Sequence, residues 1–305
     1  MRTVEIQGGI SRDHLVTVGR PPAYDQPGGP GVYAALGAAR GAAVADARAG
    51  TSTAVRLRTT LPVGEPDIRE LLTGAGVDLA TCTDGSVPRL WILDAPEGRR
   101  VLSTTPPSHE LDERDDESID RRPGTTSTDT DVLLRSAPGA GLDGTARPAV
   151  VVVDPDQRAI AAHGWDYLTD LAATTDVFVP SRVQLTQLHP DARQAAHELR
   201  RVTGRSVVAR LDAEGALVLP ASGGTWHVLP APVDLVDTTG AGDSHAGALA
   251  AALTTPDDPR SLVNATVVAT AVVARTLSGH GPETLATGPA VTDAELAAVH
   301  VLEED

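Results

Sequence analysis

The chain of 305 residues contains no lysine, so its 25 basic residues other than histidine are all arginine. A Walker-type phosphate-binding loop requires a lysine that reaches the phosphates, and a pyridoxal phosphate enzyme requires one for its Schiff base. Both classes of protein are therefore excluded.

Other features are scarce as well. The single cysteine, Cys82, excludes internal disulfides and cysteine-built zinc sites, and it fits a reducing compartment, so we expect a cytoplasmic protein. The net charge of −16 disfavours sequence-independent binding to nucleic acid or to an anionic membrane. The longest apolar segment that suits a helix, residues 262–274, is too short to span a bilayer, and the N-terminus lacks a signal-peptide apolar region. We therefore expect neither a nucleic-acid partner nor a membrane.

The order of the segments predicts an α/β fold. Short apolar runs at residues 150–153, 177–179, 207–211, 217–219 and 233–236 alternate with alanine-rich stretches, a pattern typical of a parallel sheet covered by helices. Residues 91–93 and 99–102 predict a β-hairpin across Glu97 and Gly98. Residues 106–131 are acidic, rich in Thr and Ser, and almost without large apolar side chains, so we expect a loop there. No repeat or linker divides the chain, and we predict one domain over residues 1–305.

One glycine-rich run carries most of the chemistry. Residues 237–247, DTTGAGDSHAG, stand between the apolar alternation at 233–236 and a helical stretch at 246–253. A glycine turn that enters a helix presents free N–H groups and the positive end of the helix dipole, which bind anions. Asp243 falls at the helix start, where it stays ionised and can accept a proton. The same residues could form only a tight turn with an N-cap, but the flanking Asp237 and Thr239 favour an anion site with a base, as phosphoryl transfer requires.

At this point the residues carry a family resemblance. DTTGAGDSHAG resembles the C-terminal signature of the ribokinase-like, or PfkB, carbohydrate kinases. Weaker resemblances run through most of the chain in the family's order: GGISRD at 8–13, GGPGVYAALG at 28–37, VG at 63–64, GVD at 76–78 and VVVDP at 151–155. The resemblance implies a three-layer α/β/α fold with a mostly parallel central sheet. It also implies a small β-sheet lid drawn from about residues 11–35 and 85–105, through which a homodimer could form.

The resemblance also assigns roles around the glycine run. Asp243 would be the base that takes the proton of a hydroxymethyl group attacking the γ-phosphorus of ATP. The amides of Gly240, Ala241 and Gly242 would form the anion hole. Asp237 and Thr239 match positions that bind a monovalent cation such as K⁺, although Asp237 could equally stabilise the turn. ATP would bring Mg²⁺, which bridges phosphates and usually retains several waters.

A second group of residues matches the family's substrate site. Asp13 is the candidate for sugar hydroxyls, because a carboxylate accepts two hydrogen bonds from a vicinal diol; its alternative is a surface loop residue. Gly28 and Gly29 would allow backbone contact with the sugar. Tyr33 stands where many members carry Asn, so the contact there is altered.

The nucleotide side departs from the pattern. The family's Asn-x-x-Glu motif is Ser181-x-x-Gln184 here, which removes a carboxylate that helps organise Mg²⁺ and phosphate. Asp212 stands where its nucleotide-binding Gly-x-x-Gly begins, and only Gly215 of that pair matches. Gly281, in SGHG at 278–281, resembles the loop that closes on adenine and cation.

The sequence thus predicts an ATP-dependent kinase acting on a hydroxymethyl group of a sugar, polyol or nucleoside. The aromatic content of 2% favours a sugar over a nucleoside base, which needs rings to stack on. The altered Asn-x-x-Glu motif leaves a non-catalytic ligand-binding relative as an alternative. An oxidoreductase is disfavoured, because no G-x-G-x-x-G follows a first strand. His245 replaces a common Phe after the catalytic Asp, and we interpret it as a packing residue, not a second base.

Overall fold

The computed structural model describes residues 1–95, 98–103, 129–138 and 147–304. Apart from its last three residues, the predicted acidic loop at 106–131 lies outside these ranges. The described residues form a ten-stranded central sheet. Its strands, in spatial order, are β16 (His300–Glu304), β15 (Thr225–Leu229), β14 (Ala216–Leu219), β13 (Ser206–Arg210), β12 (Val177–Phe178), β11 (Val150–Asp154), β10 (Val132–Ser136), β1 (Arg2–Gln7), β4 (Thr53–Arg58) and β6 (Val77–Asp78).

The sheet is mostly parallel. The strands from β13 to β6 run parallel to their neighbours, whereas β14, β15 and β16 extend the other edge in antiparallel pairs. The predicted runs at 150–153, 177–179, 207–211 and 217–219 coincide with β11, β12, β13 and β14. These strands are nearly continuous apolar runs because both faces of a parallel sheet are covered.

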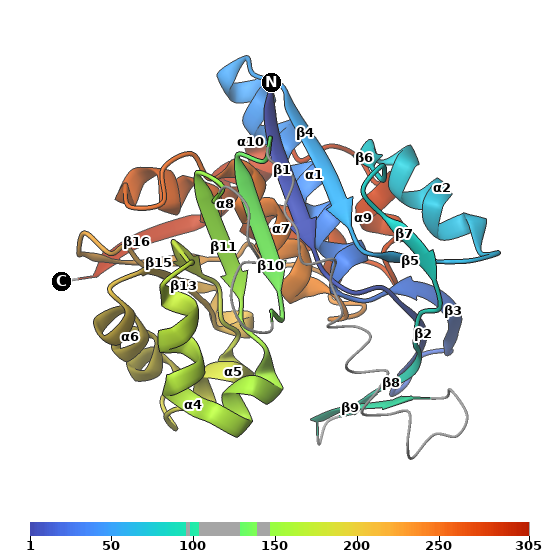
Figure 1. Cartoon of the computed structure of the whole chain (residues 1–305), viewed down its shortest axis with the longest axis horizontal. Coiled ribbons are helices and arrows are strands. Elements are labelled where there is room, and N and C mark those ends of the chain that lie inside the picture. Colours follow the sequence, from blue (N-terminus) through green and yellow to red (C-terminus); the bar gives the residue numbers. More distant parts are fainter. Residues whose placement is uncertain (96–97, 104–128, 139–146, 305) are drawn as a thin grey trace.

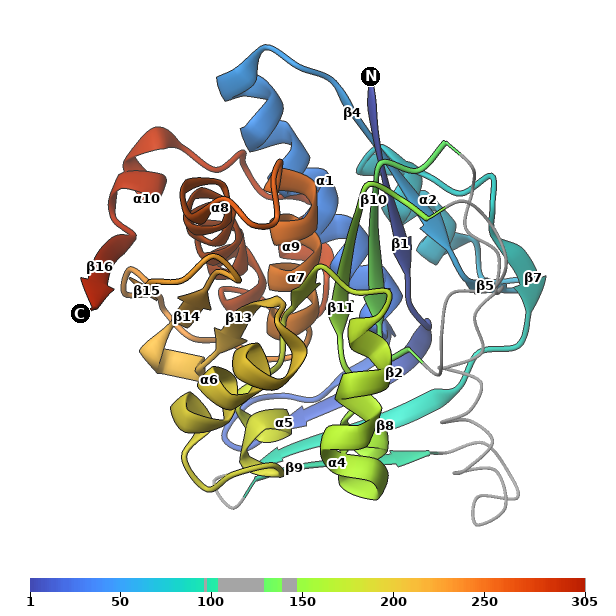
Figure 2. The same cartoon turned by 60° about the vertical axis from the view of Figure 1, so that its left-hand side comes forward.

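Helices cover both faces, as the fold prediction required (Figures 1 and 2). On one face lie α1 (Pro30–Ala49), α7 (Ala241–Ala252) and α8 (Pro259–Leu277), with the shorter α2 (Pro66–Gly74), α9 (Glu283–Thr287) and α10 (Asp293–Ala297). On the other lie α4 (Gln157–Ala172), α5 (Arg182–Thr186) and α6 (Ala192–Thr203). Alternate residues of β11 enter different cores: Val150 and Val152 pack with α1 and α7, and Val151 and Val153 pack with α4 and α6. The prediction of a three-layer α/β/α fold is confirmed.

Small residues set the register of α1 against α7. A Cβ atom on Gly37 would come within 2.2 Å of Ser244 O, and one on Gly41 within 2.6 Å of Ala248 O. These contacts advance by four residues along both helices, so α1 and α7 run parallel and begin at the same end of the molecule. The segment before α1 and the glycine run before α7 are therefore brought to one edge of the sheet.

A second, four-stranded sheet lies beyond the carboxyl end of β1 (Figures 1 and 2). We call it the lid sheet; its strands, in spatial order, are β3 (Ala23–Gly28), β2 (Ser11–Thr17), β8 (Arg89–Ala95) and β9 (Gly98–Ser103). The antiparallel pair β8–β9 confirms the predicted hairpin. Leu15, Leu90 and Ile92 form a small buried cluster within this sheet. A separate parallel pair, β5 (Thr60–Pro62) and β7 (Thr83–Gly85), connects it to the region of β4.

One predicted strand is wrong. Residues 231–238 form no strand, and Leu235 is 54% exposed. Pro230 and Pro232 have no N–H for a ladder, and the Val236 N–H donates instead to Leu277 O at the end of α8, at 2.7 Å. The helix that follows begins at Ala241, five residues before the predicted stretch.

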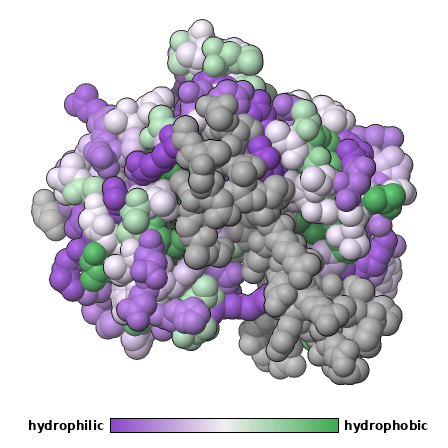
Figure 3. Space-filling view, viewed as in Figure 1, coloured by the Kyte–Doolittle hydropathy of each residue, from purple (hydrophilic) through white to green (hydrophobic). Residues whose placement is uncertain are grey.

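One face of the molecule is seen in the space-filling view of Figure 3. On the face in Figure 3, hydrophilic residues prevail among those not drawn in grey, and hydrophobic atoms form small separate groups. None of the helices in the described ranges combines the length and apolar character needed to cross a membrane.

Candidate active site

The glycine run forms a sharp turn into α7. Gly240 precedes the helix with φ 74°, a left-handed conformation that glycine adopts without strain. Ala241, Gly242 and Asp243 form the first turn, so Asp243 lies at the positive end of the helix dipole as predicted. The Ala241 N–H closes the turn on Thr238 O at 3.2 Å. Within the described residues no such bond engages the amides of Gly240 and Gly242, which leaves these two for an anion.

Tyr33 lies directly beneath this turn. A Cβ atom on Gly240 would come within 2.1 Å of the Tyr33 ring, and Tyr33 is 1% exposed. Glycine is therefore required at position 240 for two reasons: other residues rarely adopt its positive φ, and any side chain would collide with the Tyr33 ring. We call residues 238–242, the turn that leads into α7, the anion loop. Tyr33 of α1 supports this loop, and its predicted substrate contact stays a prediction.

Asp237 is buried beside the same loop. Its Oδ1 accepts hydrogen bonds from the N–H and the hydroxyl of Thr239, at 3.0 and 2.9 Å. Its Oδ2 has no hydrogen-bond partner among the described residues, and His280 Nδ1 lies 3.9 Å from it. The next residue, Gly281, lies against Gln26 of β3, since a Cβ on Gly281 would be 3.0 Å from Gln26 Oε1. A buried carboxylate oxygen without a donor fits a bound cation.

Three side chains from different strands and helices meet on the other side of the loop. Arg210, the last residue of β13, donates from Nη2 to Asp154 Oδ1 at 2.7 Å. Asp154 ends β11 and also accepts from Gln184 Nε2 at 3.2 Å. Burial raises the pKa of Asp154, while Arg210 and Gln184 act in the opposite direction. The Arg210 guanidinium reaches the anion loop, because a Cβ atom on Gly242 would come within 2.7 Å of Nη1.

His245 is enclosed near this cluster. It is 6% exposed, and neither ring nitrogen has a hydrogen-bond partner within the described ranges. Burial, and then the charge of Arg210, lower the pKa of His245 to about 3. The imidazole is therefore neutral, as the interpretation of a packing residue requires.

The structure explains both departures on the nucleotide side. Ser181 and Gln184 form a capping box at the start of α5: the Ser181 side chain accepts from Gln184 N, and Gln184 Oε1 accepts from Ser181 N at 2.6 Å. Asp212 takes the left-handed conformation, φ 54°, at the position where the family has glycine. Aspartate adopts this conformation more readily than most residues other than glycine. Arg182 holds Asp212 with an ion pair of 2.9 Å.

Gly215 closes the same loop. Its φ is 86°, and a Cβ there would lie 2.1 Å from Val228 O. Its carbonyl accepts from Leu211 N at 2.7 Å. Gly215 is thus required for the loop's shape, whatever the loop binds.

The predicted substrate residues also meet. Asp13 is 2% exposed, and its Oδ1 accepts from Ser11 Oγ at 2.7 Å. Gly28 lies against this carboxylate, because a Cβ on Gly28 would be 1.9 Å from Asp13 Oδ2. Gly29 has φ 85°, and a Cβ there would be 2.8 Å from Gly9 O. Asp13 is therefore a buried residue of β2 and not a residue of an exposed loop.

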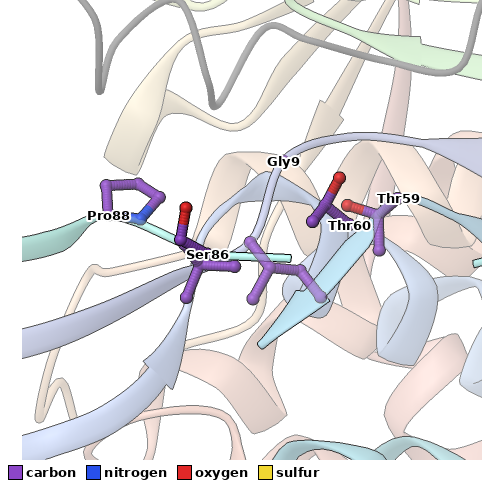
Figure 4. Close-up of a pocket in the computed structure, with 7 residues that line it drawn as sticks. Gly9, Thr59, Thr60, Ser86 and Pro88 are labelled. Carbon is purple, nitrogen blue, oxygen red and sulfur yellow. The ribbon is translucent and has the colours of Figure 1, made fainter. Parts of the chain in front are cut away.

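A cavity of about 200 Å³ lies beside Gly9 and Ile10, which lead into β2 (Figure 4). Three residues with hydroxyl groups line it, Thr59, Thr60 and Ser86, together with Gly9, Ile10, Val87 and Pro88. Uncharged hydroxyls suit a small polar ligand. Sequence reasoning missed these residues; the available signal was that Thr59 directly follows β4, at the carboxyl edge where α/β sheets bind ligands.

Arg210 and Asp154 were missed as well. Both end parallel strands, β13 and β11, and carboxyl ends of parallel strands meet at one edge. No local spacing links them, because they lie 56 residues apart.

Comparison with known proteins agrees with this arrangement. Residues 154–285 match the family model described as pfkB family carbohydrate kinase. A 1-phosphofructokinase of Escherichia coli K12 is 51% identical over 59 residues, so this match spans 19%, about a fifth, of the length of each chain.

Two solved structures align over nearly the whole chain. Fructokinase from Vibrio cholerae O395, with fructose, ADP and calcium bound, has a TM-score of 0.68 and 18% identity, covering 98% of both chains. Aminoimidazole riboside kinase from Salmonella enterica, with its riboside and an ATP analogue, has a TM-score of 0.67 and 20% identity, covering 97% of this chain and 100% of that one. The resemblance to the ribokinase-like pfkB carbohydrate kinases is therefore confirmed: the chain has their fold, and its residues 154–285 carry their family pattern.

Proposed function

We propose that the chain is an ATP-dependent kinase that transfers the γ-phosphoryl group of ATP to a hydroxymethyl group of a sugar or sugar-like acceptor. The observation that carries the proposal is the position of Asp243, on the first turn of α7 directly after a glycine loop with two available amides. The family match and the fold support the same reaction class, phosphotransfer to an alcohol.

The residues have separate tasks in this reaction. Asp243 accepts the proton of the acceptor hydroxyl as its oxygen forms a bond to the γ-phosphorus, and the bond from that phosphorus to the β,γ-bridging oxygen breaks to release ADP. The amides of Gly240 and Gly242 and the dipole of α7 stabilise the charge on the transferred oxygens. Mg²⁺ neutralises the phosphates of ATP when bound, and it takes few ligands from protein in such sites. The described residues contain no cluster of three His, Cys, Asp or Glu suited to a metal.

Asp237 is the proposed ligand of a monovalent cation. Its Oδ2 is buried and lacks a hydrogen-bond donor within the described ranges, while Thr239 fixes Oδ1. A cation there would compensate the buried charge and hold the segment that leads into the anion loop. K⁺ is the proposed ion.

The acceptor site is proposed at Asp13 and the neighbouring cavity. The arginines nearby are committed to carboxylates: Arg12 pairs with Glu65 at 2.5 Å and with Asp67, and Arg89 pairs with Glu65 at 2.6 Å. A phosphorylated acceptor would need a cation, which Arg12 and Arg89, among the described side chains, do not supply because they are paired. The arrangement therefore supports a neutral polyhydroxylated acceptor.

One observation favours a nucleoside as the second candidate. His14, Tyr24 and Trp91 of the lid sheet form a ring cluster, with centroids 4.9 Å apart for His14 and Trp91 and 6.0 Å apart for Tyr24 and Trp91. Aromatic rings in a lid could stack on a base. The Salmonella neighbour is named for a riboside substrate, whereas the Vibrio neighbour is named for a sugar.

The test is ATP consumption with Mg²⁺ and K⁺ across a panel of sugars, polyols and nucleosides, with fructose 1-phosphate as the charged comparator. The proposal predicts turnover on a neutral sugar or polyol. Turnover confined to nucleosides would favour the second candidate, and turnover confined to the phosphorylated sugar would contradict the assignment of Arg12 and Arg89. Detectable ATP binding without turnover on any acceptor would favour a non-catalytic relative.

A further inference from the structure

Arg210 reaches the anion loop although neither the motif nor the family resemblance gives it a task. We propose that the Arg210 guanidinium binds the terminal phosphoryl group of ATP beside the Gly242 amide, as a cationic part of the anion site. This inference rests on the proposed kinase function and deepens it.

The first argument is position. Arg210 ends β13, and its main-chain N–H donates to Pro180 O at 2.9 Å, which fixes the base of the side chain. A Cβ on Gly242 would come within 2.7 Å of Arg210 Nη1. The guanidinium therefore lies against the residue that precedes Asp243, and the absence of a side chain at 242 is what allows this approach.

The second argument is orientation. Nη2 donates to Asp154 Oδ1 at 2.7 Å, and both side chains are about nine-tenths buried, with 11% and 9% exposed. Gln184 Nε2 donates to the same Asp154 oxygen at 3.2 Å and to Pro155 O at 2.6 Å, and this holds the carboxylate in place. A guanidinium held at one corner is pre-organised, so little rotamer entropy is lost when its other donors bind a ligand.

The third argument is unused hydrogen-bonding capacity. Arg210 Nε is buried and has no hydrogen-bond partner among the described residues. Unpaired buried donors are rare in native proteins because each one costs free energy. The neighbouring His245 is neutral and adds no competing charge, since burial and Arg210 hold its pKa at about 3.

These three properties fit a phosphate better than a purely structural pair. A planar guanidinium matches the spacing of phosphate oxygens and forms charge-assisted bonds with them. Gln184, which bonds to Asp154, is uncharged and adds no second carboxylate to the Arg210–Asp154 pair.

The experiment compares the affinities for ATP, ADP and AMP by titration calorimetry with Mg²⁺. The variants are Arg210→Gln, which removes the charge, and Arg210→Lys, which keeps the charge but lacks the planar guanidinium and its several N–H donors. The double variant Arg210→Gln with Asp154→Asn removes both members of the pair, so no unpaired charge is left buried if the single variant fails to fold. The control is Arg193→Gln, which breaks a partly exposed ion pair with Glu304 between α6 and β16.

The expected result is an ATP-to-ADP affinity ratio about tenfold or more below that of the wild type in Arg210→Gln and in the double variant. Arg210→Lys should recover part of the ratio, and AMP affinity and the Arg193→Gln control should match the wild type. A ratio unchanged by Arg210→Gln or the double variant, or equal losses for ATP and ADP, would overturn the inference while leaving the kinase proposal intact. A wild-type chain that binds no ATP would overturn both.

Discussion

Replacing His245 by phenylalanine should remove part of the acid sensitivity of the folded protein. His245 is buried without hydrogen-bond partners in the described ranges, and its pKa is lowered from 6.5 to about 3 by burial and by Arg210. Between these two values the unfolded chain binds a proton at His245 and the folded chain does not. His245 therefore has no effect on stability well above pH 6.5, and it destabilises the folded protein increasingly as the pH falls from 6.5 toward 3.

The size of the effect follows from the two pKa values. At pH 8 the imidazole is neutral in both states and contributes nothing. At pH 5 the unfolded state gains a factor of about 30 from protonation, which lowers the free energy of unfolding by about 2 kcal/mol. This difference hardly depends on the folded pKa, provided that it lies well below 5.

The measurement is urea unfolding at pH 8 and pH 5, followed by tryptophan fluorescence, for the wild type, His245→Phe and the control His163→Gln. His163 is exposed on α4, so its replacement should leave the pH dependence unchanged. A larger ring at position 245 can strain the core, but that cost is the same at both pH values and cancels in the comparison. His245→Phe should lose about 2 kcal/mol less than the wild type between pH 8 and pH 5. An equal loss in both proteins would refute the view of a buried, neutral His245.

Three further changes test the loops of the site. In chemical denaturation, Gly240→Ala should lower the free energy of unfolding by about 1–3 kcal/mol more than Gly50→Ala does. Both glycines have positive φ, but only Gly240 lies against the Tyr33 ring. Equal losses in the two variants would contradict that contact. Asp212→Gly should raise the melting temperature or leave it unchanged, because it removes a backbone strain of about 1 kcal/mol from the left-handed φ and loses only a largely exposed ion pair. Asp212→Val should lower the melting temperature. A lower melting temperature in Asp212→Gly would contradict the presence of backbone strain at Asp212. KCl should raise the activity and the melting temperature more than NaCl does, and Asp237→Asn should abolish this difference. A wild type that responds to neither salt would contradict the proposed cation site.

Local patterns predicted much of the fold and the centre of the site. The valine-rich strands were recognisable because their residues are buried on both faces of the sheet. The start of α7 near Asp243 was predictable because closely spaced glycines indicate a turn before the helical stretch. The hairpin β8–β9 was evident from its own alternation.

The failures have a tertiary origin. The segment before the glycine run alternates like a strand, but the Val236 N–H donates a hydrogen bond to Leu277 O at the end of α8. No local sequence pattern predicts that partner. The support of Gly240 by Tyr33 depends on the register of α1 against α7. The pairing of Arg210 with Asp154 depends on the strand order of the sheet, which brings residues from two strand ends together.

The most direct test of the kinase proposal is to measure turnover and ATP affinity together in Asp243→Asn. Asp191→Asn is the matched control, because Asp191 also lies at a helix start, as the N-cap of α6, but away from the glycine run. The proposal predicts that Asp243→Asn lowers turnover on the accepted sugar by about 10²–10⁴-fold, the usual contribution of a general base, with ATP affinity retained and the control unaffected. Turnover at the wild-type level in Asp243→Asn would contradict it.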